Sequence, residues 1–219
     1  MKTVAILSVI AVCIIAVVAT AFNGTSIEGS GDLKKEKRNV SGFTDIDAGG
    51  AIKLDIVQGD GFDVEVEADD NIIALVETKV SGNTLEIQMN EDYSCSNSTV
   101  HVTVKLPKLE SLDLSGASLA KAIGINTRRL AVGVFGSSQL TLTGSAATFD
   151  VDLSGASQLY ADEFNSDVVT VECSGASKCH VHANTSITID ASGASNIYYS
   201  GDPKNVIRET SGVSKIAKR

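Results

Sequence analysis

Acidic side chains recur at one position of a repeated phrase in the C-terminal half of the chain. In five of six copies an Asp or Glu stands three residues before a glycine, and these residues are Asp113, Asp152, Glu172, Asp190 and Glu209. The second copy has Gly133 at this position. Carboxylates stacked at the spacing of neighbouring strands, roughly 4.8 Å, repel one another and need compensation. The pattern therefore indicates a binding stripe for cations or a basic partner, or else an ordinary solvated face.

The same carboxylates suggest a second chemistry. Two carboxyl groups about 5 Å apart can act as nucleophile and acid in a retaining glycosidase. A catalytic pair also needs a unique cleft in which burial raises one pKa, whereas these carboxylates are repeated and flanked by small residues. The repeated serines are poor nucleophile candidates because no base stands at a matching position. We expect no catalytic residue, with polysaccharide cleavage as the enzymatic alternative.

Cysteine and histidine are the other residue types that could support chemistry. Cys173 and Cys179 flank the fourth glycine at positions where other copies have apolar residues. They are therefore either two buried thiols or a disulfide in an oxidising compartment. His180 and His182 alternate beside them on an outward face, but a third metal ligand is missing. We expect neither a metal site nor a cofactor.

The repeat itself predicts the elements that position these residues. The phrase is Ser-Gly-Ala-Ser in four copies, Phe-Gly-Ser-Ser at 135–138 and Ser-Gly-Val-Ser at 211–214. Its glycines, 18 to 20 residues apart, are Gly116, Gly136, Gly155, Gly175, Gly193 and Gly212. A fixed period near twenty is typical of stacked units. Period-two alternation around each glycine, as in Val151-Asp-Leu153, indicates strands.

These features predict an all-β fold, a single-stranded parallel β-helix or β-solenoid with coils of roughly 19–20 residues. The usual hand of parallel crossovers makes it right-handed. Each corner glycine is expected to adopt a positive φ. The serine two residues later should point inward and satisfy backbone groups at the bend. These serines are Ser118, Ser138, Ser157, Ser177, Ser195 and Ser214.

The N-terminus has the pattern of an export signal. A positive start precedes an apolar run at 4–18 and the cleavage motif Ala19-Thr-Ala21, so residues 1–21 are predicted to be a signal peptide. The alternative is an uncleaved membrane anchor, because the apolar run approaches a spanning length. Residues 22–38 contain Gly, Ser and then Lys, which predicts a flexible linker. A single domain is expected at 39–219.

Acidic residues outnumber basic ones, and the formal net charge is −9. An acidic chain without a basic stripe argues against nucleic acid and against simple attraction to anionic lipid. The only predicted membrane contact is therefore an uncleaved N-terminus. Short strands at 40–110, with a hairpin around Gly82-Asn83, are expected to cap or begin the solenoid.

Several segments together resemble a known family. They are Val40-Ser-Gly-Phe-Thr-Asp-Ile46, Gly82-Asn-Thr-Leu-Glu-Ile87, Leu106-Pro-Lys-Leu109, the Ser-Gly-Ala-Ser units and Tyr199-Ser-Gly-Asp-Pro-Lys204. Over about residues 39–217 the chain resembles the auto-transporter adhesin, head GIN-domain family of exported bacterial proteins. The resemblance implies a β-helix-like fold and an envelope or secreted location. It implies no catalytic residue.

The predicted function is an exported, non-enzymatic, adhesin-like interaction module that is periplasmic, cell-surface or secreted. Its flat faces would bind an envelope polysaccharide or a protein, and the tyrosines Tyr160, Tyr198 and Tyr199, expected on the outside, give sugar binding only weak support. One alternative is a structural scaffold whose coil ends or faces stack into homo-oligomers. The other is a polysaccharide-degrading β-helix enzyme.

Overall fold

The computed structural model describes residues 25–219, so the predicted signal peptide at 1–21 lies outside the described residues. The described chain consists of strands, turns and one turn of 3-10 helix, η1 (Ile73–Leu75). The strands are β1 (Thr25–Glu28), β2 (Leu33–Arg38), β3 (Asp45–Ala48), β4 (Ile52–Gln58), β5 (Asp63–Asp69), β6 (Val76–Ser81), β7 (Thr84–Met89), β8 (Tyr93–Ser96), β9 (Val100–Leu106), β10 (Ser111–Leu114), β11 (Leu119–Val134), β12 (Gln139–Leu153), β13 (Gln158–Cys173), β14 (Lys178–Ala191), β15 (Asn196–Ser200), β16 (Asn205–Thr210) and β17 (Lys215–Lys218). Within residues 25–219, no helix is long and apolar enough to cross a membrane.

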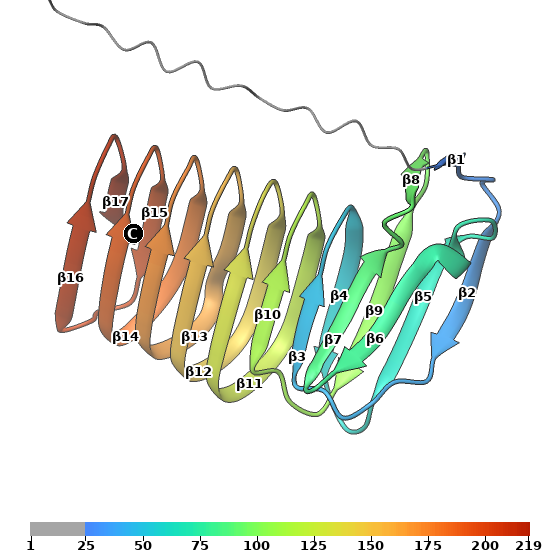
Figure 1. Ribbon diagram of the computed structural model, residues 1–219. Helices are drawn as coiled ribbons and strands as arrows, with labels where there is room; N and C mark the ends of the chain where they lie inside the picture. Colours follow the sequence, from blue (N-terminus) through green and yellow to red (C-terminus); the bar gives the residue numbers. More distant parts are fainter. Residues whose placement is uncertain (1–24) are drawn as a thin grey trace, which may run out of the picture.

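The C-terminal half is a parallel β-solenoid, as the repeat predicts. The long strands β11 to β14 stack in register, so that Leu153 pairs with Val134 on one side and with Cys173 on the other. Figure 1 shows the coils side by side along one axis, with the N-terminal strands at one end and β16 at the other. The solenoid has about five turns of about 20 residues. The predicted fold class is therefore confirmed, and the hand of the coil stays a prediction.

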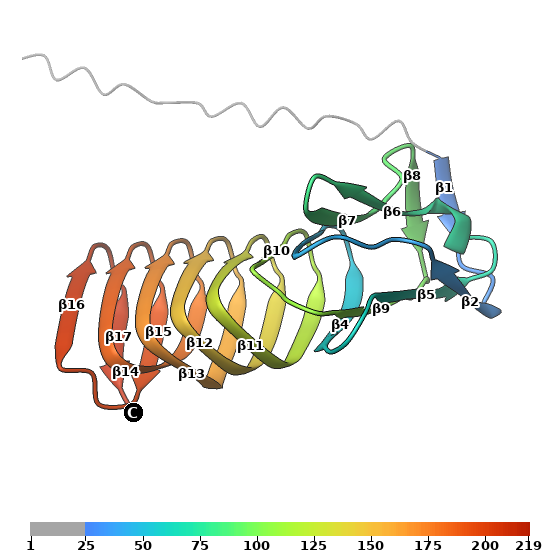
Figure 2. The same ribbon diagram turned by 90° about the horizontal axis from the view of Figure 1, so that it is seen from below.

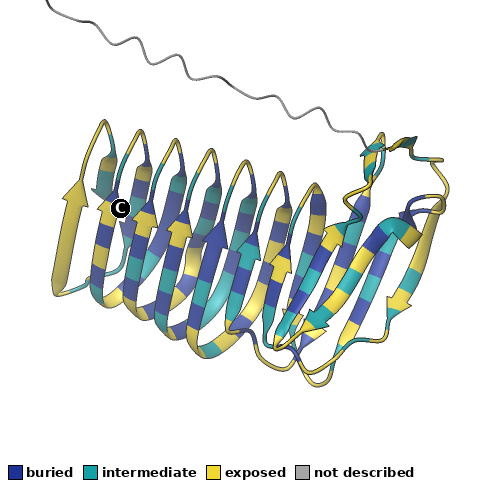
Figure 3. Ribbon diagram, in the orientation of Figure 1, coloured by how far each residue is buried: buried dark blue, intermediate teal, exposed yellow. Residues whose placement is uncertain are grey.

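Each long strand contributes to two faces of the solenoid. The first face runs from β6 through β7, β3, β10 and the C-terminal halves of β11–β14 to β16. The second face runs from β2 through β5, β9, β4 and the N-terminal halves of β11–β14 to β15 and β17. Alternate apolar side chains point between the faces into one continuous core. Figure 3 shows the buried positions as dark blue bands that alternate with exposed ones along the strands. This alternation follows from the two-residue period of strands.

The corners have the conformation that the sequence predicts. The six repeat glycines have φ between +71° and +79°, the left-handed region that favours glycine. A side chain is also excluded by packing, because a Cβ at Gly155 would lie 2.5 Å from the Gly136 carbonyl oxygen of the preceding coil. Five of the six serines are buried in a row, and the Ser195 hydroxyl donates to the Ser192 carbonyl at 2.8 Å, whereas the Ser157 hydroxyl has no partner and Ser214 is only half-buried. Glycine and serine are thus building elements of the corner.

The structure adds one coil that the repeat pattern missed. Gly50, with φ +109°, precedes the first predicted corner, and its carbonyl accepts a hydrogen bond from the Ala117 amide at 2.6 Å. Its strands β3 and β4 pair with β10 and β11. The strands at 59–110 form an insertion between this coil and the next. The expectation that these strands cap or begin the solenoid is confirmed, as is the β6–β7 hairpin, in which Ser81 pairs with Thr84.

The flexible linker predicted at 22–38 is wrong for its described part. Residues 25–28 form β1, which pairs with β8, and residues 33–38 form β2, which pairs antiparallel with β5. Figure 2 shows these strands gathered at the N-terminal end of the solenoid. The Lys-rich run looked like a solvated linker because it lacks apolar residues, but its charges match the acidic strand beside it. The folded unit therefore includes residues before 39.

Candidate binding face

The predicted acidic residues lie in one row along the first face. Strand pairing places Asp152 beside Glu172, Glu172 beside Asp190, and Asp190 beside Glu209. The row continues upstream through Gly133 to strands that the repeat pattern missed. We call the following residues, in spatial order, the acidic stripe: Glu86, Asp47, Asp113, Asp152, Glu172, Asp190 and Glu209. Its members are exposed or half-buried, and all but Glu209, which lies on the exposed last strand, stand between two buried neighbours.

The stripe exists because each coil places the same strand position above the previous one. Neighbouring strands are about 4.8 Å apart, so carboxylates at successive positions repel one another. Among residues 25–219, no stripe carboxylate lies within ion-pairing distance of a Lys, Arg or His side chain. Within the described chain, the negative charges of the stripe are therefore screened by solvent and salt and not by an ion pair.

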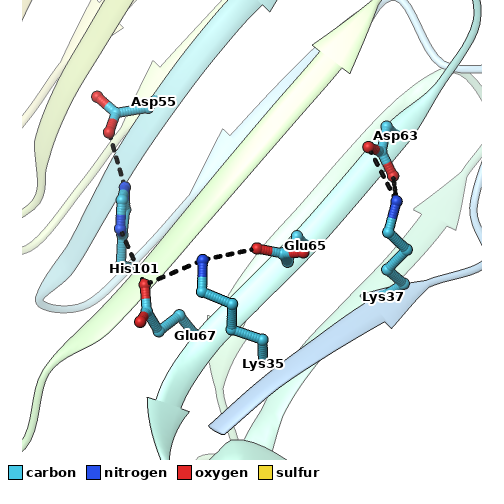
Figure 4. Close-up of polar contacts among 7 residues, drawn as sticks. All are labelled: Lys35, Lys37, Asp55, Asp63, Glu65, Glu67 and His101. Carbon is cyan, nitrogen blue, oxygen red and sulfur yellow. Dashed lines mark hydrogen bonds and ion pairs between the residues drawn. The ribbon is translucent and has the colours of Figure 1, made fainter. Parts of the chain in front are cut away.

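The N-terminal part of the second face shows how this chain compensates charge elsewhere. Lys35 lies 3.0 Å from Glu65 and 3.6 Å from Glu67, and Lys37 lies 2.9 Å from Asp63 (Figure 4). These pairs join β2 to β5, whose register places Lys35 opposite Glu67 and Lys37 opposite Glu65. Within residues 25–219, no member of the acidic stripe forms such an ion pair, although the strand register places Lys79 opposite Glu86.

His101 continues this compensated network towards the solenoid. Its Nε2 lies 2.7 Å from Asp55 on β4, and its Nδ1 lies 3.7 Å from Glu67 on β5 (Figure 4). The imidazole therefore bridges carboxylates on both neighbouring strands. No sequence pattern pointed to this bridge, because the three residues come from separate strands.

Proton affinity is altered in the N-terminal part of the stripe, at Asp47 and Asp113. Burial raises the pKa of Asp113, and the neighbouring carboxylates of Asp47, Asp45 and Asp152 raise it further. The pKa of Asp47 is raised by burial and then by Glu86. Both shifts have the direction expected when a charged carboxylate is desolvated beside like charges. A bound cation would relieve this cost.

A hollow of about 330 Å³ opens at the break in the stripe. Its lining residues are Asp113, Ala131, Val132, Gly133, Phe135, Asp150, Val151, Asp152, Thr170 and Glu172. The Phe135 ring lies against Gly133, so close that a Cβ added to the glycine would be 2.6 Å from the ring. A Cβ there would also collide with the Asp113 carboxylate. The hollow therefore combines an aromatic ring, an apolar wall and several carboxylates.

The predicted cysteine pair is buried and unbonded. Cys173 and Cys179 point into the core, as their columns predict, and both are free thiols. A hydrogen bond with Cys173, followed by burial, raises the pKa of Cys179. Of the two alternatives, the structure therefore has two buried thiols, and no disulfide joins Cys173 to Cys179. A protonated, buried thiol is a poor nucleophile and a poor metal ligand.

The histidines lie on the outward side of β14 but differ in exposure. His180 is only 4 % exposed, because it is packed between the tilted rings of Tyr160 and Tyr198 at centroid distances of 5.3 and 5.0 Å. His182 contacts Ser200 and Asn184. In the part of the chain that the structure describes, no group of three or more His, Cys, Asp or Glu residues is arranged to hold a metal ion.

The expected outward position of Tyr199 is wrong. Tyr199 is 2 % exposed and pairs with Val181, whose side chain points into the core. Adjacent tyrosines on a strand must point to opposite sides, so only one of the pair at 198–199 can lie outside. The support that Tyr199 gave to sugar binding is therefore lost.

Fold and surface together define a β-solenoid with a stacked acidic face. The family described as "Putative auto-transporter adhesin, head GIN domain" matches residues 42–203. The chain belongs to this family, which confirms the resemblance noted from the sequence. The search among curated proteins found no match.

Solved structures support the same architecture. The chain is similar to a putative adhesin from Bacteroides fragilis, with 22% identity, a TM-score of 0.74, and coverage of 88% of this chain and 100% of the other. A putative adhesin from Parabacteroides merdae gives 14% identity, a TM-score of 0.58, and coverage of 90% and 100%. A putative lipid binding protein from Parabacteroides distasonis gives 16% identity, a TM-score of 0.55, and coverage of 89% and 100%. At these identities the likeness establishes the fold alone.

Proposed function

We propose that this protein is an exported, non-enzymatic interaction module of the cell envelope or surface, and that its acidic stripe binds a basic protein partner. The adhesin-like family supports the general class. The choice of a basic partner has a different basis, which is the charge arrangement of the first face.

The uncompensated stripe is the observation that carries the proposal. Seven carboxylates follow one another along the face with a single break at Gly133. The same chain pairs Lys35 and Lys37 with carboxylates on another face, so basic residues are available to this fold where charge is to be neutralised. A row left unpaired is complementary to a partner that brings its own positive charges.

The test compares two variants with the same change in charge. Asp152→Asn/Glu172→Gln removes two stripe charges, and the matched control Glu65→Gln/Glu67→Gln removes two compensated charges from the second face. We expect labelled octalysine to bind the purified wild-type protein with an affinity that falls as salt rises. The stripe variant should bind about three- to tenfold more weakly, and the control should bind like the wild type.

Equal weakening by both variants would show that only the net charge matters, and would contradict a stripe-specific site. A polysaccharide panel is run alongside, with retention of protein and release of new reducing ends recorded in the same tubes. If a polysaccharide retains the stripe variant as well as it retains the wild type, the ligand is assigned as a polysaccharide. Release of reducing ends would reverse the non-enzymatic assignment.

A further inference from the structure

The second copy of the repeat departs from the other five at three positions, which are Gly133, Phe135 and Ser137, and the first two of these matter here. Gly133 stands where the others have a carboxylate, and Phe135 stands where the others have the serine that precedes the corner glycine. Those serines are Ser115, Ser154, Ser174, Ser192 and Ser211. The two departures meet in space, since the Phe135 ring lies against Gly133. A glycine at position 133 leaves room for the Phe135 ring, so the two departures depend on each other.

Gly133 and Phe135 line the hollow of about 330 Å³ at the break in the acidic stripe. Phe135 is half-buried, so part of its ring lines the hollow. Asp113 lies on the adjoining strand to one side, and Asp152 on the strand to the other. Asp150 is already engaged by Arg129 at 2.8 Å, which leaves Asp113, Asp152 and Glu172 as the unpaired carboxylates of the lining.

We propose that this hollow binds the ammonium end of a lysine side chain from the partner, and this proposal rests on the function proposed above. An aromatic ring attracts a cation, and an ammonium ion is bound more strongly by a ring when carboxylates are also present. The apolar wall, to which Ala131 and the Phe135 ring contribute, suits the methylenes of the lysine stem. A hydrated metal ion would gain nothing from that wall.

Within the row of carboxylates, the hollow is thus the position that recognises one particular type of cation. The rest of the stripe attracts positive charge without distinguishing its chemistry. The hollow distinguishes it, because an organic cation on an apolar stem uses the ring, the apolar wall and the carboxylates together, whereas a hydrated metal ion uses the carboxylates alone.

The decisive variant restores the repeat consensus. Gly133→Asp/Phe135→Ser gives the second copy the residue pair that the other copies carry, so its thermal unfolding by circular dichroism should stay close to that of the wild type. It also adds a carboxylate to the stripe. If charge alone governs binding, this variant binds octalysine more tightly than the wild type. If the hollow binds an ammonium group, it binds more weakly, by about fivefold.

Two single variants complete the series, all measured by fluorescence anisotropy at one fixed ionic strength. Phe135→Ser should weaken octalysine binding about fivefold, and Phe135→Tyr, which keeps a ring, should bind like the wild type. Wild-type affinity in both Phe135→Ser and the consensus variant would overturn the proposal.

The outcomes also separate this inference from the function on which it rests. If Asp152→Asn/Glu172→Gln weakens binding while the Phe135 variants do not, the basic-partner function stands and the lysine site fails. If octalysine does not bind the wild type, both fail. A glucosamine octamer tests the other source of an ammonium group. Tighter binding of that amino sugar than of octalysine would overturn the assignment to lysine.

Discussion

At the scale of single residues, the corner glycines combine two separate constraints. Their positive φ disfavours any side chain, and the carbonyl of the preceding coil occupies the space that a Cβ would need. Elsewhere in the chain these constraints separate, because Gly61 has φ +75° but no atom within 4 Å of its Cβ position. Comparing a corner glycine with Gly61 therefore isolates how much the contact between stacked coils adds to the cost of a side chain.

Gly155→Ala should therefore destabilise the protein far more than Gly61→Ala. The exposed site pays only the cost of the left-handed conformation, about 1–2 kcal/mol. The corner site adds a contact at 2.5 Å from the Gly136 carbonyl oxygen and should lose about 3 kcal/mol or more. Urea unfolding followed by circular dichroism measures both. Similar losses at the two sites would mean that the coils adjust to the extra atom.

Asp113 predicts a specific pH dependence of stability. Its pKa is raised in the folded chain, chiefly by burial, so the folded state holds the proton more readily than the unfolded state. The free energy of unfolding should therefore fall as pH rises from the ordinary Asp pKa, about 3.9, through the raised value. Asp113→Asn removes this loss.

The Asn variant should melt about 2 °C higher than the wild type at pH 7, and the two should converge near pH 3. Calorimetric melting curves at several pH values test this. A lower melting temperature of the variant at pH 7 would show that the carboxylate makes a stabilising contact in the free protein.

At the scale of elements, β2 is held to the domain by charge. Its outward Lys35 and Lys37 meet Glu65, Glu67 and Asp63 across the strand pair. Leu33 is 57% exposed, so apolar burial contributes little at that end of the strand. Charged edge strands also discourage pairing with other chains.

Reversing these charges should loosen β2. In Lys35→Glu/Lys37→Glu, hydrogen exchange of the β5 amides that bond to β2 should accelerate about tenfold, because several weak pairs become repulsive. Adding Glu65→Lys/Glu67→Lys should restore slow exchange. Slow exchange in the first variant alone would mean that backbone hydrogen bonds suffice to hold the strand.

The sequence predicted the repetitive part of the fold well, since one residue pattern recurs at each corner. It missed the coil of Gly50 because 66 residues separate that glycine from Gly116, and because Ala-Gly-Gly-Ala lacks both serines of the phrase. It missed β2 because the partners of a charged strand cannot be seen in a single segment. Such errors arise where contacts are distant in sequence.

The candidate site shows the same division. Five stripe residues were predicted from their repeated position, whereas Asp47 and Glu86 belong to elements outside the recognised repeat. The hollow was not predicted, because Phe135 read as a variation of the phrase until the structure placed its ring against Gly133. A paired departure from an otherwise regular repeat was the available signal.

At the scale of the whole molecule, the last coil carries charges in columns that are apolar elsewhere. Arg208 pairs with Ile189, and Lys218 pairs with Tyr199, so both occupy core-facing columns. Arg208 also hydrogen-bonds the Tyr199 hydroxyl and lies 5.1 Å from its ring centre. Polar residues on terminal repeats are the usual means of ending a solenoid.

We therefore expect the protein to sediment as a monomer, contrary to the scaffold alternative of stacked coil ends. Arg208→Leu/Lys218→Leu should produce association that increases with concentration, because it exposes an apolar end with unpaired strand edges. Analytical ultracentrifugation of both proteins tests this. A wild-type oligomer at micromolar concentration would favour the scaffold.

The register of the coils has one more consequence. Each turn adds one strand to the first face and lengthens that face by about 4.8 Å. The number of coils therefore sets the length of the face. Duplicating a 20-residue unit such as 154–173 would lengthen the face without redesigning the core, since each repeat contacts only its neighbours. Contact with a long partner would then strengthen through multivalency, with each new turn acting at a high effective concentration. Gene duplication could in this way adjust adhesion strength in steps of one coil.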